Sequence, residues 1–204
     1  MKKFGLVVIG AHIGIHIQQD LKKYEDQNIL LIEPVPHNID ALKENTLKFK
    51  NVIIESIAIS SKKENTKFYF VKANSINKLG KHWASGIGSF NKQHILNHKT
   101  KRFKIEEIDI ASIEVQSLSF SDLVEKHEIS LINKLQIDVE GTEYEILNSI
   151  NFDQVNIDTI IFESKHFDGT FKEGSKLEEI KKKLIKNSYE IRKLDNENYL
   201  AKKN

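Results

Sequence analysis

The stretch LVVIGAHIG, residues 6–14, decides the fold class. Its short run of β-favouring apolar residues ends at Gly10, and Ile13, Ile17 and Leu21 then recur at the spacing of one helix face. Glycine lets a chain leave a strand sharply and allows a helix or a ligand to approach the backbone closely. Strand, glycine turn and helix in this order predict the opening unit of an α/β sheet.

Apolar runs and helical patterns alternate along the rest of the chain. Pro34 and Pro36 end the second run, because proline cannot donate to a central ladder, and Pro36 is suited to begin a helix. We expect further strands at residues 28–32, 52–54, 57–59, 68–71, 113–118, 135–139, 157–162, 189–193 and 198–202, and helices from 36, at 120–126, around 144–150 and around 177–184. This alternation predicts an α/β fold with a doubly wound, mostly parallel sheet and an antiparallel C-terminal hairpin. Residues 1–204 are expected to form one domain, with residues 74–100 as a substrate-side insertion.

Composition narrows the function classes. The 204 residues include no cysteine, which excludes a disulfide scaffold, thiol catalysis and cysteine-ligated metal sites. The 31 basic residues nearly balance 29 acidic ones, and only Arg102 and Arg192 are arginine, so we expect no nucleic-acid partner. No stretch is long and apolar enough to span a bilayer, so we expect no membrane partner. The absence of cysteine fits a reducing cytoplasm, where we expect the protein to be located.

The first glycine turn limits the ligand. A dinucleotide site needs glycine where this chain has His12 and Ile15, and the phosphate-binding pattern ending in Gly-Lys-Ser/Thr is missing as well. A nucleoside-type ligand without a pyrophosphate remains. Glu33 ends the second expected strand, 23 residues after Gly10, where a carboxylate can accept hydrogen bonds from both ribose hydroxyls.

Acidic residues end two later strands. Asp138, Glu140 and Glu163 lie there, and His166 follows in the loop expected above the sheet. Convergence of acids and an imidazole at one sheet edge is typical of acid–base chemistry. Alternatively, Glu140 and Glu143 favour the N-terminus of the following helix through its dipole. A divalent metal on Asp138, Glu140 and His166 would follow no known ligand spacing, so we expect no metal.

Three segments carry a resemblance to a known family: VIGAHIG at residues 8–14, IEPVPHN at 32–38 and LQIDVEGTE at 135–143. They resemble the FkbM-type methyltransferases, whose pattern reads roughly D-V-G-A-N-x-G, F-E-P-x-P-x-N and L-K-x-D-V-E-G-x-E. The resemblance covers about residues 5–165. It departs at Val8, where the family has an acid, and at His12, where the family has asparagine.

The resemblance implies a Rossmann-like class I enzyme that uses S-adenosyl-L-methionine (SAM) to methylate a hydroxyl of a sugar or another small-molecule or glycan acceptor. It also implies roles for particular residues. Gly10, Ala11, His12 and Gly14 would line the methionine side of SAM, Glu33 would hold the ribose, Ser56 and Ile57 would flank the adenine, and Asp138 and Glu140 would face the reacting centre.

The acceptor side is a further hypothesis. A hydroxyl is a poor nucleophile at neutral pH, so Asp138, Glu140 or His166 is expected to act as a base. Residues 74–99 are expected to cover the acceptor, which Trp83 and Glu163 would contact. Trp83 either stacks on a sugar ring or fills a local hydrophobic gap.

Two other function classes stay open from the sequence. A non-catalytic SAM- or nucleoside-binding protein is favoured by Val8 in place of the acid. A nicotinamide-dependent oxidoreductase is disfavoured by His12 at the second glycine position.

Overall fold

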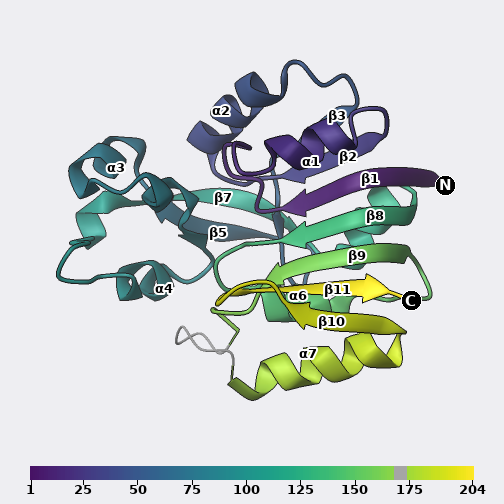
Figure 1. The fold of residues 1–204 in the computed structure, drawn as a ribbon. Coiled ribbons are helices and arrows are strands. Elements are labelled where there is room, and N and C mark those ends of the chain that lie inside the picture. The colour runs from purple at the N-terminus through teal and green to yellow at the C-terminus, as the bar shows by residue number, and fades with distance from the viewer. Residues whose placement is uncertain (168–173) are drawn as a thin grey trace.

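The structure, a computed structural model, describes residues 1–167 and 174–204 and contains two β-sheets (Figure 1). The large sheet has seven strands in the order β10-β11-β9-β8-β1-β2-β3. Its strands are β1 (Lys2–Ile9), β2 (Asn28–Ile32), β3 (Val52–Glu55), β8 (Ile129–Ile137), β9 (Asn156–Glu163), β10 (Tyr189–Lys193) and β11 (Asn198–Lys203).

The strand directions confirm the predicted α/β fold. β1 pairs in parallel with β2 and β8, and the parallel ladder continues to β3 on one side and β9 on the other. β11 is antiparallel to both β9 and β10, so the C-terminal hairpin closes the sheet as predicted. The strand order reverses between β1 and β8, and ligands of open α/β sheets bind at the carboxyl ends of such a pair.

Both faces of the large sheet are buried, which explains the continuous apolar runs. Successive side chains of β1 point to opposite faces: Leu6 and Val8 pack against α1 (Gln18–Lys23) and α2 (Pro36–Thr46). Val7 and Ile9 belong to the larger core on the other face, which α5 (Phe120–Lys126), α6 (Glu143–Ser149) and α7 (Gly174–Lys186) cover. Figure 1 shows α1 and α2 on one side of the sheet and α6 and α7 on the other.

The small sheet is built from the middle of the chain. Its order is β4-β7-β5-β6, with β4 (Ala58–Ile59), β5 (Glu64–Val71), β6 (Gly88–Ser89) and β7 (Ile110–Leu118). Two helical segments connect β5 to β6: α3 (Ala73–Leu79) and the 3₁₀ helix η1 (His82–Gly86). Two more connect β6 to β7: α4 (Lys92–Asn97) and the 3₁₀ helix η2 (Glu107–Asp109). This region projects from the carboxyl edge of the large sheet (Figure 1). The expected insertion, residues 74–100, forms most of its helical part.

Several predicted boundaries differ from the structure, and those of the first helix and of β8 affect the site. The first helix begins only at Gln18, because His12 and Gly14 have φ angles of +50° and +76°, which a helix cannot continue. β8 begins at Ile129 rather than Leu135 and ends at Ile137 rather than Val139. Asp138 and Glu140 therefore lie in a turn and do not share a strand face.

The local prediction for α2 is confirmed. α2 begins at Pro36 and buries Ile39, Leu42 and Thr46 on one face. Among the residues that the structure describes, no helix is long and apolar enough to cross a membrane.

Candidate active site

An open pocket of about 870 Å³, a volume that includes solvent at its mouth, lies where the carboxyl ends of β1 and β8 meet the small sheet. Both sheets line it. The large sheet and its loops supply Ile9, Gly10, His12, His16, Ile32, Glu33, Pro34, Val35, Asp138, Val139, Glu140 and Thr142, and the middle of the chain supplies Ile57, Ala58, Ile59, Phe68, Trp83, Gly86, Gly88 and Phe90.

The turn after β1 forms the floor of the pocket. The backbone N–H groups of Gly10 and Ala11 both donate to the carbonyl of Ile32, which joins the ends of β1 and β2. Gly10 has a φ of +88°, and a Cβ atom there would lie 1.7 Å from the carbonyl oxygen of Asp138. Only glycine fits between the two strand ends, so this residue sets the distance across the floor.

Glu33 lies beside this floor with 5% of its surface exposed. Its Oε1 accepts from the backbone N–H of Val35 at 3.0 Å and from Asn38 Nδ2 at 3.2 Å, and its Oε2 accepts from the backbone N–H of His12 at 2.9 Å. Burial raises the pKa of Glu33, and these three donors oppose the rise. A carboxylate offers about four acceptor positions. Oε2 therefore keeps one position for a ligand hydroxyl.

The 3₁₀ helix η1 covers the pocket through side-chain contacts. His12 Nε2 lies 2.6 Å from Ser85 Oγ, and Asn38 Nδ2 donates to the carbonyl of Ser85 at 2.8 Å. Burial, and then the neighbouring His16 and His37, lower the pKa of His12 to about 4, so its imidazole is neutral at pH 7. The turn after β1 therefore forms the floor and, through His12, also contacts the cover, which α2 contacts through Asn38.

Trp83 lies in the same 3₁₀ helix. Its indole lines the pocket, packs 4.6 Å from the ring of Phe103 between centroids, and stays 50% exposed. The indole therefore packs against Phe103 and keeps an exposed surface, which a stacking role would require.

A buried carboxylate shapes the turn after β8. Glu143, the first residue of α6, is fully buried, and its two carboxylate oxygens accept from the backbone N–H groups of Val139 and Gly141, each at 2.9 Å. Burial raises its pKa to about 7. Glu140 lies between these two donors in the sequence, and its φ is +60°.

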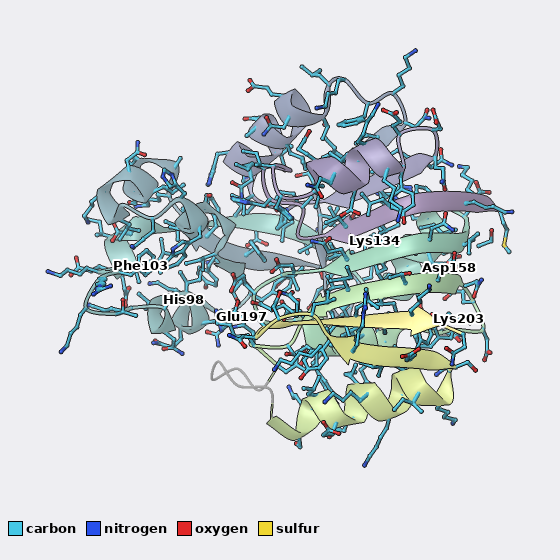
Figure 2. The ribbon with its side chains drawn as sticks, viewed as in Figure 1. His98, Phe103, Lys134, Asp158, Glu197 and Lys203 are labelled. Carbon is cyan, nitrogen blue, oxygen red and sulfur yellow. The ribbon has the colours of Figure 1, made fainter. Side chains whose placement is uncertain are left out.

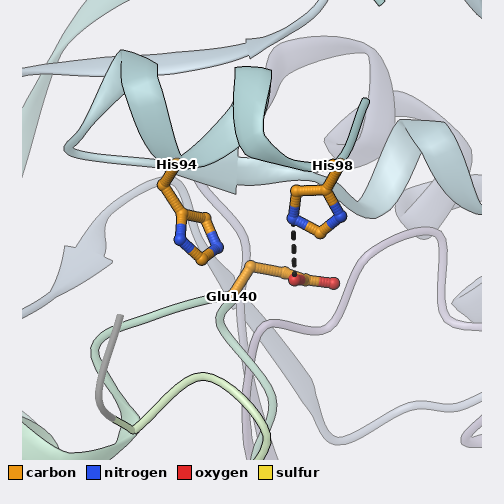
Figure 3. A group of neighbouring side chains, drawn as sticks. All are labelled: His94, His98 and Glu140. Carbon is orange, nitrogen blue, oxygen red and sulfur yellow. Dashed lines mark ion pairs between the residues drawn. The ribbon is translucent and has the colours of Figure 1, made fainter. Parts of the chain in front are cut away.

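Histidines and carboxylates gather beside the pocket. Glu140 Oε2 lies 2.9 Å from His166 Nε2 and 3.7 Å from His98 Nε2, and Glu163 Oε2 lies 3.5 Å from His166 Nε2. His94 lies one helical turn before His98, and both rings point from α4 toward Glu140 (Figure 3). Three segments of the chain therefore meet here: α4, the turn after β8 and the end of β9.

The cluster contains one ionised pair and several groups whose pKa favours the neutral form. Burial alone would lower the pKa of His166 and raise that of Glu140, but their mutual hydrogen bond outweighs both effects. Burial lowers the pKa of His98 to about 4 and also lowers that of His94. Burial, with Glu140 and Asp138 adding to it, raises the pKa of Glu163 to about 8. Glu163 is therefore mostly protonated at pH 7.

Asp138 faces the pocket from the end of β8. Water reaches its side chain through the pocket mouth, yet protein atoms surround it closely. This crowding is the largest cause that raises its pKa to about 6, and the Glu140 carboxylate adds to it. At pH 7 the group is mostly ionised, with a pKa near the working pH, which suits a base.

The C-terminal hairpin holds the loop that carries His166. Ser164 donates from its backbone N–H and its hydroxyl to the carbonyl of Glu197, at 2.8 and 3.2 Å, and Lys165 pairs with the Glu197 carboxylate at 2.8 Å. Figure 2 shows Glu197 and His98 at the carboxyl edge of the large sheet, and Asp158 and Lys203 at the opposite edge.

The structure brings most predicted site residues together, in two groups. Six lie in the pocket wall: Gly10, His12, Glu33, Ile57, Asp138 and Glu140, with Trp83 in the cover. Glu163 and His166 lie behind Glu140 in the imidazole cluster. Three residues lie outside the lining: Ala11 is buried beneath the floor, Gly14 packs against Leu42, and Ser56 is exposed.

Several residues of the site escape the sequence analysis. His94 and His98 stand four residues apart, a spacing that places both on one helix face, and this is the signal that could have selected them. Asn38 lies within the Glu-Pro-x-Pro-x-Asn segment, but its bond to Ser85 joins residues 47 positions apart. Val8 is fully buried in the core and does not line the pocket.

Comparison with known proteins now decides the family. The model of the methyltransferase FkbM domain matches residues 9–196. The chain belongs to the FkbM methyltransferase family. It is a SAM-dependent methyltransferase, as the resemblance of its motifs implies. The search of curated proteins finds no match.

Solved structures with a similar fold are distant from this FkbM-domain chain. Aeropyrum pernix fibrillarin, determined with natively bound SAM, is 12% identical with a TM-score of 0.46, and the match covers 98% of this chain and 66% of that one. Geobacter metallireducens precorrin-6y C5,15-methyltransferase is 12% identical, with a TM-score of 0.49 and coverage of 100% and 82%. The ribosomal protein L11 methylase of Lactobacillus delbrueckii is 12% identical, with a TM-score of 0.46 and coverage of 100% and 72%.

The residues of the pocket fit SAM. Oε2 of Glu33 keeps an acceptor position for a ribose hydroxyl, and Ile57 with Phe68 offers an apolar wall for a base. The glycine turn exposes backbone at the floor, where a bulkier residue would close the gap between β1 and β8. SAM supplies an electrophilic methyl group on a sulfonium sulfur when it is bound.

Proposed function

We propose that this FkbM-family protein transfers the methyl group to a hydroxyl oxygen of a sugar, or of another small-molecule or glycan acceptor. The observation that supports this is the position of Asp138, an ionisable carboxylate in the pocket wall beside the glycine floor. A hydroxyl needs such a base, whereas a neutral amine does not.

The chain's own residues have distinct tasks in this reaction. The floor around Gly10 and the carboxylate of Glu33 hold the donor, while η1 and Trp83 cover the acceptor and exclude water. Asp138 accepts the hydroxyl proton as the oxygen bonds to the methyl carbon and the carbon–sulfur bond breaks, with its electron pair passing to sulfur. Because a methyl transfer needs in-line approach, this positioning supplies a large share of the rate.

Glu140 and His166 support the base from behind. Their hydrogen bond at 2.9 Å keeps the Glu140 carboxylate ionised and fixed near Asp138, which favours the protonated form of Asp138 after transfer. His166 is 1% exposed, so in this arrangement it acts as a positioning residue.

The experiment is methyl transfer from SAM to a panel of mono- and oligosaccharides and small alcohols, followed by mass spectrometry of products and of S-adenosylhomocysteine. Asp138→Asn is expected to lower kcat by about 10²–10⁴-fold while SAM affinity changes little. Asp153→Asn, at an exposed loop position, is the matched control and should keep wild-type turnover.

Two results would contradict the proposal. A product methylated on nitrogen would contradict the acceptor class, and full turnover of Asp138→Asn, Glu140→Gln and His166→Gln would leave positioning alone as the catalytic contribution. Binding of SAM by calorimetry without transfer to any acceptor would instead support a non-catalytic binding protein.

A further inference from the structure

Three imidazoles surround one carboxylate beside the pocket, on the side away from Glu33. The ring centroids of His94, His98 and His166 lie 5.0, 5.3 and 5.7 Å apart, and Glu140 contacts two of these rings. The rings come from α4 and from the loop after β9, so only the tertiary fold brings them together. Proton transfer from one hydroxyl requires a single base, so this cluster contains more titratable groups than that reaction needs.

The spacing of these groups matches that around a single metal ion. Imidazole nitrogens bind Zn²⁺ at about 2.0–2.1 Å, so three tetrahedral imidazole ligands have ring centroids about 5 Å apart and ligand atoms about 3.4 Å apart. The observed centroid separations lie at this value. The two distances from Glu140 Oε2, 2.9 Å to His166 and 3.7 Å to His98, lie on either side of the ligand separation.

The nitrogen and oxygen atoms that would bind an ion also group in this way. The ligand atoms of His94, His98 and Glu140 all lie within 4.8 Å of one another, as do those of Glu140, Glu163 and His166. Glu140 belongs to both groups, so it is the centre of the cluster. His166 is within this ligand distance of Glu140 but is not grouped with His94 and His98, although its ring packs against both of theirs, so side chains must move for all four residues to bind one ion.

We propose that His94, His98, His166 and Glu140 bind one divalent first-row transition-metal ion. The ligand chemistry selects this class: imidazole suits Zn²⁺, Co²⁺, Fe²⁺ and Cu²⁺, whereas Mg²⁺ and Ca²⁺ require mostly oxygen ligands. This proposal differs from the sequence-based expectation of no metal, which concerned Asp138, Glu140 and His166 only.

Metal binding is coupled to protonation in this cluster. A metal-binding imidazole must be neutral, so the ion and protons would compete for these rings. The ion would displace the proton that His166 shares with Glu140 and would take over the neutralisation of that carboxylate. Binding should therefore release a proton.

The location suggests what the ion does, and this part rests on the proposed function. Glu140 lines the pocket, so the ion would lie at the pocket wall next to Asp138. Four protein ligands fill a tetrahedral shell, so an acceptor hydroxyl would bind as a fifth ligand. A hydroxyl bound in this way has a lower pKa, and the nearby Asp138 carboxylate would take its proton. The ion would then orient the acceptor as well as acidify it.

Metal binding is tested on the untagged full chain without SAM or acceptor, so that its result does not depend on methyl transfer. After chelation and dialysis, Co²⁺ is added while the visible ligand-field spectrum is recorded, and Zn²⁺ and Mg²⁺ are used as competitors. We expect one equivalent of Co²⁺ per chain, displacement by Zn²⁺ and none by equimolar Mg²⁺. Zinc should also raise the melting temperature, because an ion that binds only the folded state stabilises it.

Variants assign the ligands. His94→Gln and His98→Gln should each weaken Co²⁺ binding by about 10–100-fold or more, and the double variant should abolish the visible spectrum. His127→Gln is the matched control, because His127 pairs with Glu55 away from the cluster and should leave binding unchanged. Melting of each variant without metal shows that it is folded.

Two results would overturn the proposed metal site. Absence of Co²⁺ binding by the folded wild-type chain, or unchanged binding in the double variant, would overturn the metal site. Metal binding without methyl transfer would support the site while contradicting the proposed function, and transfer that persists in the chelated enzyme would overturn only the role of the ion.

Discussion

The large and the small sheet contribute to the same pocket by different means. The large sheet builds the floor from backbone. The carbonyls of Ile32 and Ile9 accept hydrogen bonds that join the strand ends, and two buried carboxylates accept backbone N–H groups. The small sheet and its helices reach the pocket through side chains such as Phe68, Trp83 and Phe90. Ser85 and His98 contact two residues of its wall, His12 and Glu140. The floor is therefore fixed by the fold, whereas the cover can vary with few substitutions.

The strongest test of this difference is Gly10→Ala in the floor. The added Cβ would lie 1.7 Å from the Asp138 carbonyl oxygen, so β1 and β8 must separate, and we expect a loss of about 4 kcal/mol or more of unfolding free energy. Gly80→Ala is the control: its φ is +63°, but nothing lies within 4 Å, so only the left-handed backbone costs about 1 kcal/mol. Urea unfolding measures both, and equal losses would contradict the account of the floor.

Removal of the Glu143 charge should have the next largest effect. In Glu143→Gln the amide nitrogen would face a backbone N–H of Val139 or Gly141, which leaves a buried donor unsatisfied and costs about 1–3 kcal/mol. Glu145→Gln on the same helix disrupts only its half-exposed pair with Lys176 and should cost less than about 1 kcal/mol. A smaller loss in the first variant than in the second would show that the turn after β8 does not need Glu143.

The hydrogen bond between His12 in the floor and Ser85 in the cover should weaken in acid. The folded pKa of His12, about 4, lies below the unfolded value of 6.5, so its contribution to stability is complete above pH 6.5 and is lost as the pH falls toward 4. His12→Asn, which suits the left-handed backbone, should reduce this acid sensitivity by roughly 1 kcal/mol after allowance for solvent screening.

Urea midpoints at pH 7 and pH 5 measure the effect of His12. Ser85→Ala is the companion variant, because it removes the hydrogen bond but keeps the imidazole. It should be less stable at both pH values and retain the wild-type pH dependence. The same slope in wild type and His12→Asn would contradict the assignment.

The smallest effect on stability is expected in the cover itself. Trp83 is half exposed, so Trp83→Ala should cost about 1 kcal/mol or less but raise the acceptor KM severalfold, because it removes a stacking surface. Trp83→Phe should restore most of the affinity. An unchanged KM in Trp83→Ala would indicate that the indole only fills space against Phe103.

The large sheet could be predicted because its signals are local. Pro36 begins α2, Asp195 accepts from the backbone N–H groups of Glu197 and Asn198 in the hairpin turn, and continuous apolar runs mark strands buried on both faces. Each of these depends on neighbours within a few positions. The family motifs are also short stretches of sequence, and they are what selected Glu33 and Asp138 as site residues.

The cover and the imidazole cluster could not be predicted in this way. α3 and α4 have seven and six residues, too few for a clear helical period, and β6 has two. His98 meets Glu140, and His12 meets Ser85, across 42 and 73 positions. The end of β8 was misplaced for a related reason: a buried side chain, Glu143, draws the backbone into a turn where the apolar pattern continues to Val139.

The link from Ser164 and Lys165 to Glu197 has a consequence for protein engineering. The hairpin turn lies some thirty positions after His166 in the chain. Its Glu197 nevertheless holds Ser164 and Lys165, the two residues that precede His166. A mutant library confined to residues 195–198 would remove the ion pair between Lys165 and Glu197 without changing any pocket residue. Directed evolution of a new acceptor preference could therefore begin at the far end of the polypeptide rather than in the pocket wall.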